Sequence, residues 1–104
     1  MGCAVVITPQ ATEDLAAIVG RMANDSRDRA QTFGHELIDR ALSVGAFPQM
    51  GRIVPEENDP AVRELMLGDY RIIYEVYLDR GVVYVLRFWH GARGDPDIIR
   101  TSAQ

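Results

Sequence analysis

The sequence predicts an α+β domain in which an antiparallel helical hairpin packs on one face of an antiparallel sheet. Three observations indicate this class: a β-branched run near the N-terminus, two segments with apolar residues at helical spacing, and three alternating segments joined by short turns. The chain has 104 residues, of which 47% are hydrophobic and 25% charged, and this size and composition are typical of one globular domain. We therefore treat residues 1–104 as a single domain.

The first half of the chain predicts a strand followed by two helices. Residues 4–7 form a β-branched run that predicts a buried strand. Thr8 and Pro9 then predict a helix start, with Thr8 as the N-cap and Pro9 at the first helical position, and the helical pattern ends near Asn24. Ser26 is a second N-cap, and the next helix runs to Gly45. Because the link is so short, the two helices are expected to be antiparallel neighbours.

The second half predicts a three-stranded antiparallel meander. Glycine and proline punctuate residues 45–60, so this segment is expected to be a long connection with at most a short extended piece at residues 52–54. Strands are expected at residues 62–67, 70–78 and 82–90. A two-residue turn at residues 68–69, which would pair Leu65 with Ile72, and a turn at residues 79–81 join these strands. The tail from Gly94 onward is either docked or frayed.

Strand register divides the side chains of the meander between two faces. A three-residue loop at residues 79–81 pairs Val76 with Tyr84, Tyr74 with Leu86 and Ile72 with Phe88, and this face is expected to cover the helices. The opposite face then collects a mixed set: Glu64, Met66, Arg71, Ile73, Glu75, Tyr77, Val83, Val85, Arg87 and Trp89. Exposed aromatic residues and arginines are typical of a binding surface. The alternative is that the long loop, the tail or another subunit covers this face.

Charge and cysteine content restrict the possible functions. All 11 basic residues are arginine, against 15 acidic residues, and the pI is about 5.0. This balance argues against strong direct binding to nucleic acid. Cys3, His35 and His90 lack metal-binding spacing, so no metal and no other cofactor is expected. The sequence has no bilayer-spanning run and no signal-peptide pattern, which predicts a cytoplasmic protein that does not bind membranes.

Arg71 and Arg87, with Glu75 nearby and His90 and Arg93 at the strand end, form the candidate chemical group. Arginine forks bind phosphate or carboxylate, and histidine titrates near neutral pH. Such a group could cleave RNA, with arginines neutralising the phosphate and an acid and a base moving protons. The alternative is that Arg71, Glu75 and Arg87 form cross-strand ion pairs while His90 caps a strand end. The lack of a clear base favours this alternative.

The stretch "VRELMLGDYRIIYEVYLDRGVVYVLRFWHGAR", preceded by a helical hairpin and the "P-x-x-GR" of residues 48–52, resembles the RelE/ParE superfamily of type II toxin–antitoxin toxins. The most specific elements are residues 70–74 and 90–93. The resemblance implies one of two activities. RelE-like members are ribosome-dependent mRNA endonucleases, whereas ParE-like members are not enzymes and inhibit DNA gyrase.

In the ribonuclease branch the resemblance assigns phosphate binding to Arg71, and the other catalytic candidates here are Glu75, His90 and Arg93. The chain has no lysine and no tyrosine after Tyr84, and these departures favour the ParE-like branch. That branch implies plasmid stabilisation and a ParD-like cognate antitoxin that folds on binding to give a hetero-oligomer. The residues expected to bind antitoxin or target are Arg63, Arg71, Glu75, Arg87, Trp89, His90 and Arg93. A degenerate, non-toxic homologue that only binds antitoxin is a further alternative.

Overall fold

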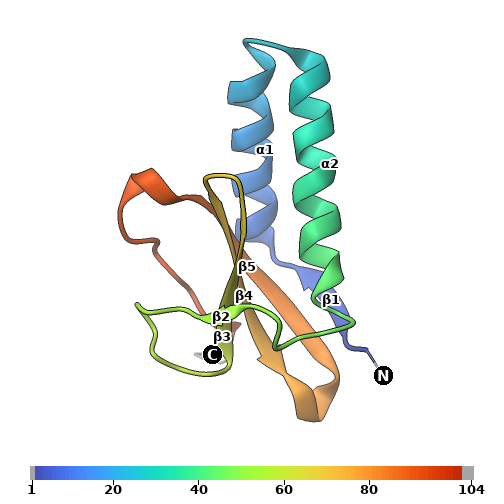
Figure 1. Cartoon of the computed structure of the whole chain (residues 1–104), viewed down its shortest axis with the longest axis vertical. Helices are drawn as coiled ribbons and strands as arrows, with labels where there is room; N and C mark the ends of the chain where they lie inside the picture. The colour runs from blue at the N-terminus through green and yellow to red at the C-terminus, as the bar shows by residue number, and fades with distance from the viewer. Residues whose placement is uncertain (1, 102–104) are drawn as a thin grey trace.

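The computed structural model describes residues 2–101 and places two helices against one five-stranded sheet (Figure 1). The strands are β1 (Ala4–Ile7), β2 (Arg52–Ile53), β3 (Val62–Leu67), β4 (Tyr70–Tyr77) and β5 (Val82–His90). Their order in the sheet is β1-β5-β4-β3-β2, with β1 parallel to β5 and the other neighbours antiparallel. The predicted fold class is confirmed. The parallel pairing of β1 with β5 had no signal in the sequence.

The two helices, α1 (Pro9–Ala23) and α2 (Arg27–Ser43), begin at the predicted N-caps. Thr8 Oγ1 accepts a hydrogen bond from the Ala11 amide, and Ser26 Oγ accepts one from the Arg29 amide, both at 3.2 Å. Gly34 lies inside α2, where a Cβ atom would approach a methyl group of Val19 to 3.0 Å. Glycine at this position therefore lets the two helices pack closely, which outweighs its low helix propensity.

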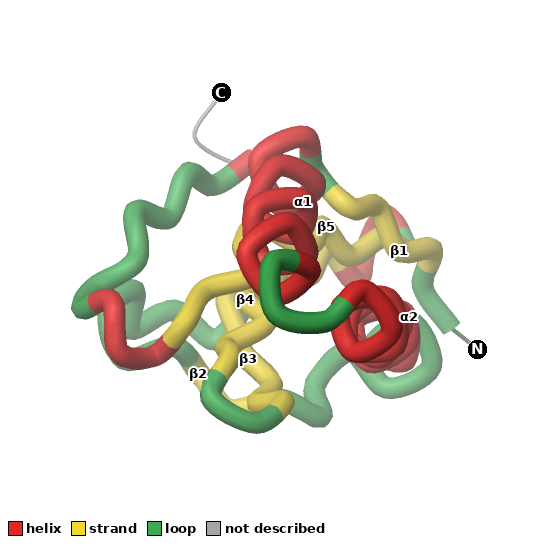
Figure 2. Tube along the Cα trace, turned by 90° about the horizontal axis from the view of Figure 1, so that it is seen from above, coloured by secondary structure: helices red, strands yellow, loops and turns green. Residues whose placement is uncertain are grey.

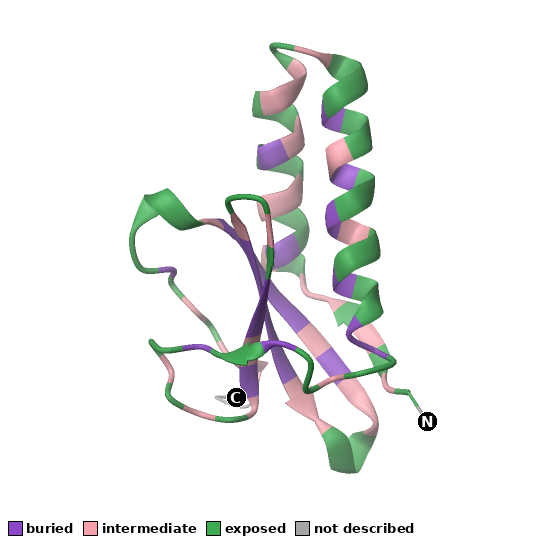
Figure 3. Cartoon of the chain, in the orientation of Figure 1, coloured by how far each residue is buried: buried purple, intermediate pink, exposed green. Residues whose placement is uncertain are grey.

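The main core lies between the helices and the sheet. Figure 3 shows buried residues along the central strands and on one side of each helix. The fully or nearly fully buried members are Ala11, Ile18, Leu37, Ala41, Val44, Leu65, Ile72, Tyr74, Val83, Val85 and Phe88. Burial of this apolar surface supplies most of the driving force for folding.

The β3–β4 register is as predicted, whereas the β4–β5 register is partly wrong. Leu65 pairs with Ile72, and Ile72 pairs with Phe88, as expected. Beyond a β-bulge, however, Tyr74 pairs with Val85, which leaves Leu86 as the extra residue of the bulge. Because of the bulge, the side chains of β5 between the turn and Leu86 face the opposite way from those of a regular strand.

The bulge exchanges side chains between the faces at the turn end of β5. Val83 and Val85 therefore lie in the main core, not on the opposite face where the regular register placed them. Tyr84, expected in the core, pairs with Glu75 on the opposite side. The turn is a 3-10 segment, Leu78–Arg80, closed by Gly81 with a φ of 64°. This turn makes the loop one residue longer than predicted, so the bulge restores the pairing of Ile72 with Phe88.

The sheet surface turned away from the helices, here called the far face, is covered by the same chain. Residues 54–60, the acidic loop, and residues 94–101, the tail, lie on this side (Figures 1 and 2). A second, smaller core lies beneath them and consists of Val54, Val62, Ile73, Trp89 and the partly buried Ile98. The expectation of an open mixed face is therefore wrong, and the alternative of cover by the loop and the tail is correct. The last predicted tail residues, 102–104, lie outside the described residues.

Candidate binding surface on the far face

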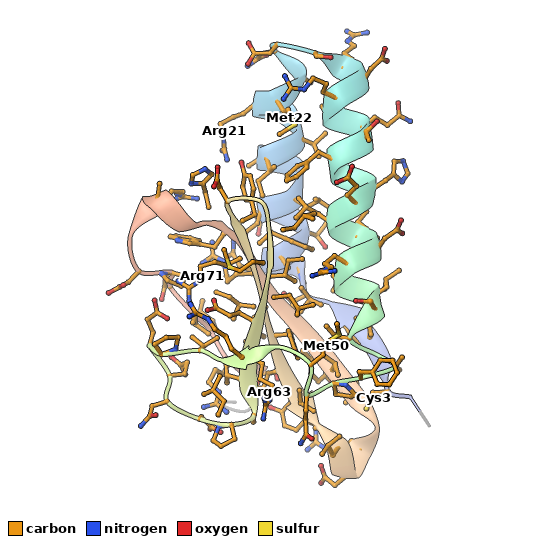
Figure 4. The ribbon with its side chains drawn as sticks, in the orientation of Figure 1. Cys3, Arg21, Met22, Met50, Arg63 and Arg71 are labelled. Carbon is orange, nitrogen blue, oxygen red and sulfur yellow. The ribbon has the colours of Figure 1, made fainter. Side chains whose placement is uncertain are left out.

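Arg71 is the second residue of β4 and is only 8% exposed. Its Nε atom donates to Glu64, a buried carboxylate of β3, and its two terminal nitrogens donate to both oxygens of Glu56 at 2.8 and 3.0 Å. Figure 4 shows the Arg71 side chain on the far-face side of the sheet. The hydrogen bonds from Arg71 lower the pKa of Glu56, and those to Glu56 raise the pKa of Arg71. The positive charge of Arg71 is thus neutralised within the chain.

Arg87 is also 8% exposed and is neutralised by Asp14 of α1. The two side chains form a bidentate pair with distances of 2.7 and 2.8 Å, and Arg87 also donates to the backbone carbonyl of Asp97 at 2.7 Å. Asp14 additionally accepts from the Phe88 amide at 3.1 Å. Asp14 therefore provides a hydrogen-bond acceptor for a backbone amide of β5 that lies beyond the end of β1. The hydrogen bonds that Arg87 donates to Asp14 raise the pKa of Arg87.

Glu75 is 1% exposed and is paired with the tail, not with a neighbouring arginine of the sheet. Arg100 donates to Glu75 at 2.8 Å and also contacts Asp59 of the acidic loop at 2.9 Å. Thr101 donates its backbone amide and its hydroxyl to the other Glu75 oxygen at 3.2 and 2.9 Å. The ion pairs among Arg71, Glu75 and Arg87 that the sequence suggested are therefore replaced by pairs with β3, the loop, the tail and α1.

The remaining predicted residues lie near the other end of the sheet. The guanidinium groups of Arg87 and Arg93 lie 4.7 and 4.2 Å from the Trp89 ring centroid, and Arg93 is exposed. His90 caps the strand end as the alternative interpretation predicted, because its Nδ1 accepts from the Ala92 amide at 3.0 Å. Its ring meets the Tyr70 ring edge-on at 4.9 Å.

Arg63 does not join the far face. It pairs with Tyr74 in the sheet, and its guanidinium donates to the backbone carbonyls of Pro60 and Gly51 at 3.0 and 2.9 Å. Its role is to hold the connection before β3. Arg52, in contrast, forms an ion pair with Glu64 on the far face and keeps a largely exposed side chain.

The four candidate ribonuclease residues are not brought together. Arg71 and Glu75 share a face, but a strand advances about 3.3 Å per residue, which separates them by roughly 13 Å. His90 pairs with Tyr70 and lies on the helix side, whereas Trp89 and Arg71 form the neighbouring pair on the far face. Arg71, Glu75, Arg87 and Trp89 do lie on the predicted face, on the adjacent strands β4 and β5.

Sequence reasoning missed the carboxylates that pair with these arginines. Glu56, which pairs with Arg71, and Asp59, which pairs with Arg100, belong to an acidic run in a loop, and that run was the available signal. Asp14 carried no signal of its role, because no local pattern reveals that α1 crosses the edge of β5. Arg100 carried no signal, because its partner Glu75 is distant in sequence.

The "P-x-x-GR" motif has a structural explanation. The Gly51 amide donates to the Tyr74 hydroxyl at 2.9 Å, and a Cβ atom at Gly51 would lie 2.5 Å from the Glu64 carbonyl oxygen. Arg52 then reaches the Glu64 carboxylate. Glycine is needed at position 51 because the backbone of Glu64 approaches too closely for a side chain. Arginine is needed at position 52 because it neutralises the buried carboxylate of Glu64. Burial raises the pKa of Tyr74.

A cleft of about 500 Å³ lies on the helix side, between α2 and the β3–β4 turn. Met22, Phe33 and Tyr70 provide its apolar lining, and charged residues including Arg29 and Asp69 complete it. The Phe33 and Tyr70 rings are in contact, with centroids 5.4 Å apart. A smaller cleft of about 270 Å³ adjoins it, since both are lined by Met22, Arg29 and Tyr70.

Residues 2–101 contain neither a group of metal-binding side chains nor a helix that could span a membrane. Within that range, no three or more histidine, cysteine or acidic side chains are grouped so that they could hold a metal ion. Neither helix described there has the length and apolar character needed to cross a membrane.

Two solved structures share this fold over most of the chain. One is the chromosomal ParDE toxin–antitoxin system from P. aeruginosa, with a TM-score of 0.71 and 19% identity over 85% of this chain and 95% of that chain. The other is the toxin–antitoxin complex RelBE2 from Mycobacterium tuberculosis, with a TM-score of 0.64 and 19% identity over 91% of this chain and 95% of that chain. No curated protein matches the sequence. The chain therefore shares the fold of these two structures.

The family to which the chain belongs follows from the sequence itself. The model of the family described as "ParE toxin of type II toxin-antitoxin system, parDE" matches residues 5–94. The chain belongs to the ParE toxin family. The match spans both helices, the whole meander and the closing residues 90–93.

Proposed function

We propose that this protein inhibits bacterial growth by binding DNA gyrase, and that a ParD-like cognate antitoxin neutralises it. The observation that carries this proposal is the engagement of Arg71 and Glu75. Both are buried on the far face in ion pairs with the chain's own side chains. An RNA-cleaving site needs charged groups that can reach a phosphate and a 2′-hydroxyl together, so this arrangement favours a toxin that acts by binding.

The proposed antitoxin site is the apolar cleft between α2 and the β3–β4 turn, continued by His90 and Arg93. The cleft offers Met22, Phe33 and Tyr70 to apolar side chains. His90 contacts Tyr70, which places it beside this lining, and the exposed Arg93 follows it at the end of β5, with its guanidinium over the Trp89 ring. A helix or strand that folds on binding can combine such apolar anchors with an acidic residue for the arginine. Arg71 and Arg87 are not proposed as antitoxin contacts, because carboxylates of this chain already neutralise them.

A supercoiling assay tests the gyrase target. Purified protein is expected to inhibit supercoiling by gyrase, and prior addition of the antitoxin encoded beside it should restore the activity. In parallel, mRNA 5′ ends are mapped after induction in cells. Intact gyrase activity together with new cuts at codon spacing would instead identify a ribosome-dependent endonuclease.

A growth assay separates a toxin from a degenerate homologue. Expression without antitoxin is expected to stop growth, and co-expression of antitoxin should relieve the arrest. Unaffected growth at high expression of folded protein, with antitoxin still bound, would identify a non-toxic antitoxin-binding protein.

A further inference from the structure

The tail is held on the far face by side chains of the sheet, in the manner of a bound peptide. The Trp89 indole nitrogen donates to the Gly94 carbonyl at 3.0 Å, and Arg87 donates to the Asp97 carbonyl at 2.7 Å. At the other end, Glu75 accepts from the Thr101 amide at 3.2 Å. Each of these sheet side chains thus binds a main-chain group of the tail. Main-chain groups are present in any extended polypeptide, so these contacts do not depend on the tail's sequence.

Two side chains of the tail supply the sequence-dependent part of the contact. Ile98 packs against the second core beside Trp89 and Ile73, whereas the adjacent Ile99 is 61% exposed. Two residues after Ile98, Arg100 reaches a cluster of carboxylates. It lies 2.8 Å from Glu75, 2.9 Å from Asp59 and 3.7 Å from Glu57.

The carboxylate cluster determines the charge that a ligand of this face must carry. Glu75 is 1% exposed, and a buried carboxylate is stable only when a positive charge or hydrogen-bond donors compensate it. A ligand that replaced the tail would therefore need a cation at the position of Arg100. The planar guanidinium suits this position, since it contacts several carboxylates at once.

The connection between β5 and the tail would allow the tail to leave the far face and another peptide to take its place. The tail leaves β5 through the short 3-10 segment Gly91–Arg93 and then Gly94, which has a φ of 81°. Between residues 92 and 101, the described contacts of the tail backbone are made with side chains, not with a neighbouring strand. Such segments open with a lower free energy than strands of a sheet.

We infer that the far face is a binding site for an extended peptide, which the chain's own residues 94–101 occupy in cis. A segment of a partner protein with a branched aliphatic residue two positions before an arginine, as in Ile98-Ile99-Arg100, would bind there by displacing the tail. This inference goes beyond the proposed function and does not depend on gyrase. It assigns the far face to a protein partner and not to RNA.

The test supplies the tail sequence in trans to a full-length variant whose own tail is weakened. The probe is a fluorescent peptide with the sequence of residues 94–101, amidated so that no terminal carboxylate faces Glu75. A tethered tail competes at an effective concentration on the order of millimolar. We therefore expect the peptide to bind the full-length Arg100→Ala variant at least tenfold more tightly than the wild-type protein. Equal affinity for the two proteins, or no binding to the variant, would overturn the inference.

Matched peptides test which side chains are recognised. A peptide with Ile99→Ala should bind the Arg100→Ala protein like the unchanged peptide, because Ile99 is exposed. Peptides with Ile98→Ala or Arg100→Ala should lose at least tenfold in affinity. If the last two peptides keep their affinity, the far face does not recognise a branched aliphatic residue followed two positions later by an arginine.

The sole tryptophan provides a readout that loss of stability alone would not reproduce. In the Arg100→Ala protein the indole N–H resonance of Trp89 should move away from its wild-type position, because the bond to the Gly94 carbonyl is weakened. Saturating peptide should return that resonance to its wild-type position. A resonance that stays displaced would show that the peptide does not occupy the site of the tail. If Arg100→Ala fails to fold, the full-length Ile98→Ala variant serves for the same titration.

Discussion

Arg71 and Glu56 face each other as two forks, with Nη2–Oε1 and Nη1–Oε2 distances of 2.8 and 3.0 Å. Glu64 binds the remaining Nε of the same guanidinium from the neighbouring strand. One arginine thus joins the acidic loop, β3 and β4. Its environment is that of a structural ion-pair network, in which the loop supplies the negative charge.

Removal of the arginine from this network should lower the stability of the protein more than removal of its loop carboxylate. Arg71→Ala leaves the buried Glu64 carboxylate with only Arg52 and is expected to lower the free energy of unfolding by about 3–5 kcal/mol. Glu56→Gln removes a partly exposed partner and should cost about 1 kcal/mol. Urea denaturation measures both, with the exposed helix residue Asp39→Asn as the control. Equal, small losses for the two variants would contradict the network.

The acidic loop should make stability depend on pH. The pKa of Glu56 and that of Asp59 lie below their ordinary values of 4.5 and 3.8, the first through its hydrogen bonds with Arg71 and the second through the Ala61 amide and Arg100. Because the folded protein binds these protons less readily than the unfolded chain, their contribution is complete above the ordinary pKa and is lost as the pH falls through the lowered one. The urea midpoint should therefore fall below about pH 4.5. The midpoint of Glu56→Gln should fall less steeply, and identical pH profiles would refute the assignment.

Two glycines should respond to alanine in opposite directions. At Gly51 a Cβ atom would lie 2.6 Å from the Tyr74 hydroxyl oxygen and closer still to the Glu64 backbone, so Gly51→Ala should cost about 1–3 kcal/mol through overpacking. At Gly20, inside α1, a Cβ atom would meet nothing within 4 Å. Gly20→Ala should stabilise the protein by about 0.5–1 kcal/mol through helix propensity. Thermal unfolding of the two variants compares them directly.

Substitution of Arg93 should weaken antitoxin binding while leaving the stability of the protein almost unchanged. The exposed guanidinium of Arg93 stacks on Trp89 at 4.2 Å, a contact worth about 0.5–1 kcal/mol at an exposed site. Arg93→Ala is therefore expected to unfold almost like the wild type, yet to bind the cognate antitoxin roughly tenfold more weakly, since an interface ion pair would be lost. Calorimetry measures the affinity, and Arg40→Ala on the exposed side of α2 is the control. Unchanged affinity would remove Arg93 from the proposed antitoxin site.

Local patterns were enough to predict the elements of this protein. Thr8-Pro9 and Ser26 set the helix starts, and Gly68-Asp69 set the β3–β4 register, because caps and tight turns depend on residues a few positions apart. Residue pattern also indicated the superfamily, which the ParE family match bears out. Each of these features is determined by residues that lie close together in the sequence.

Tertiary structure alone decided which charges are available for function. The sequence placed Arg71 and Arg87 on one face correctly, but their partners Glu56 and Asp14 come from a loop and a helix distant in the chain. The bulge at Leu86, which moved Val83 and Val85 into the core, likewise depends on how the turn and the strand end are accommodated together. A buried charge takes whichever partner the packing brings within hydrogen-bond distance, and the linear sequence does not encode that proximity in any local pattern.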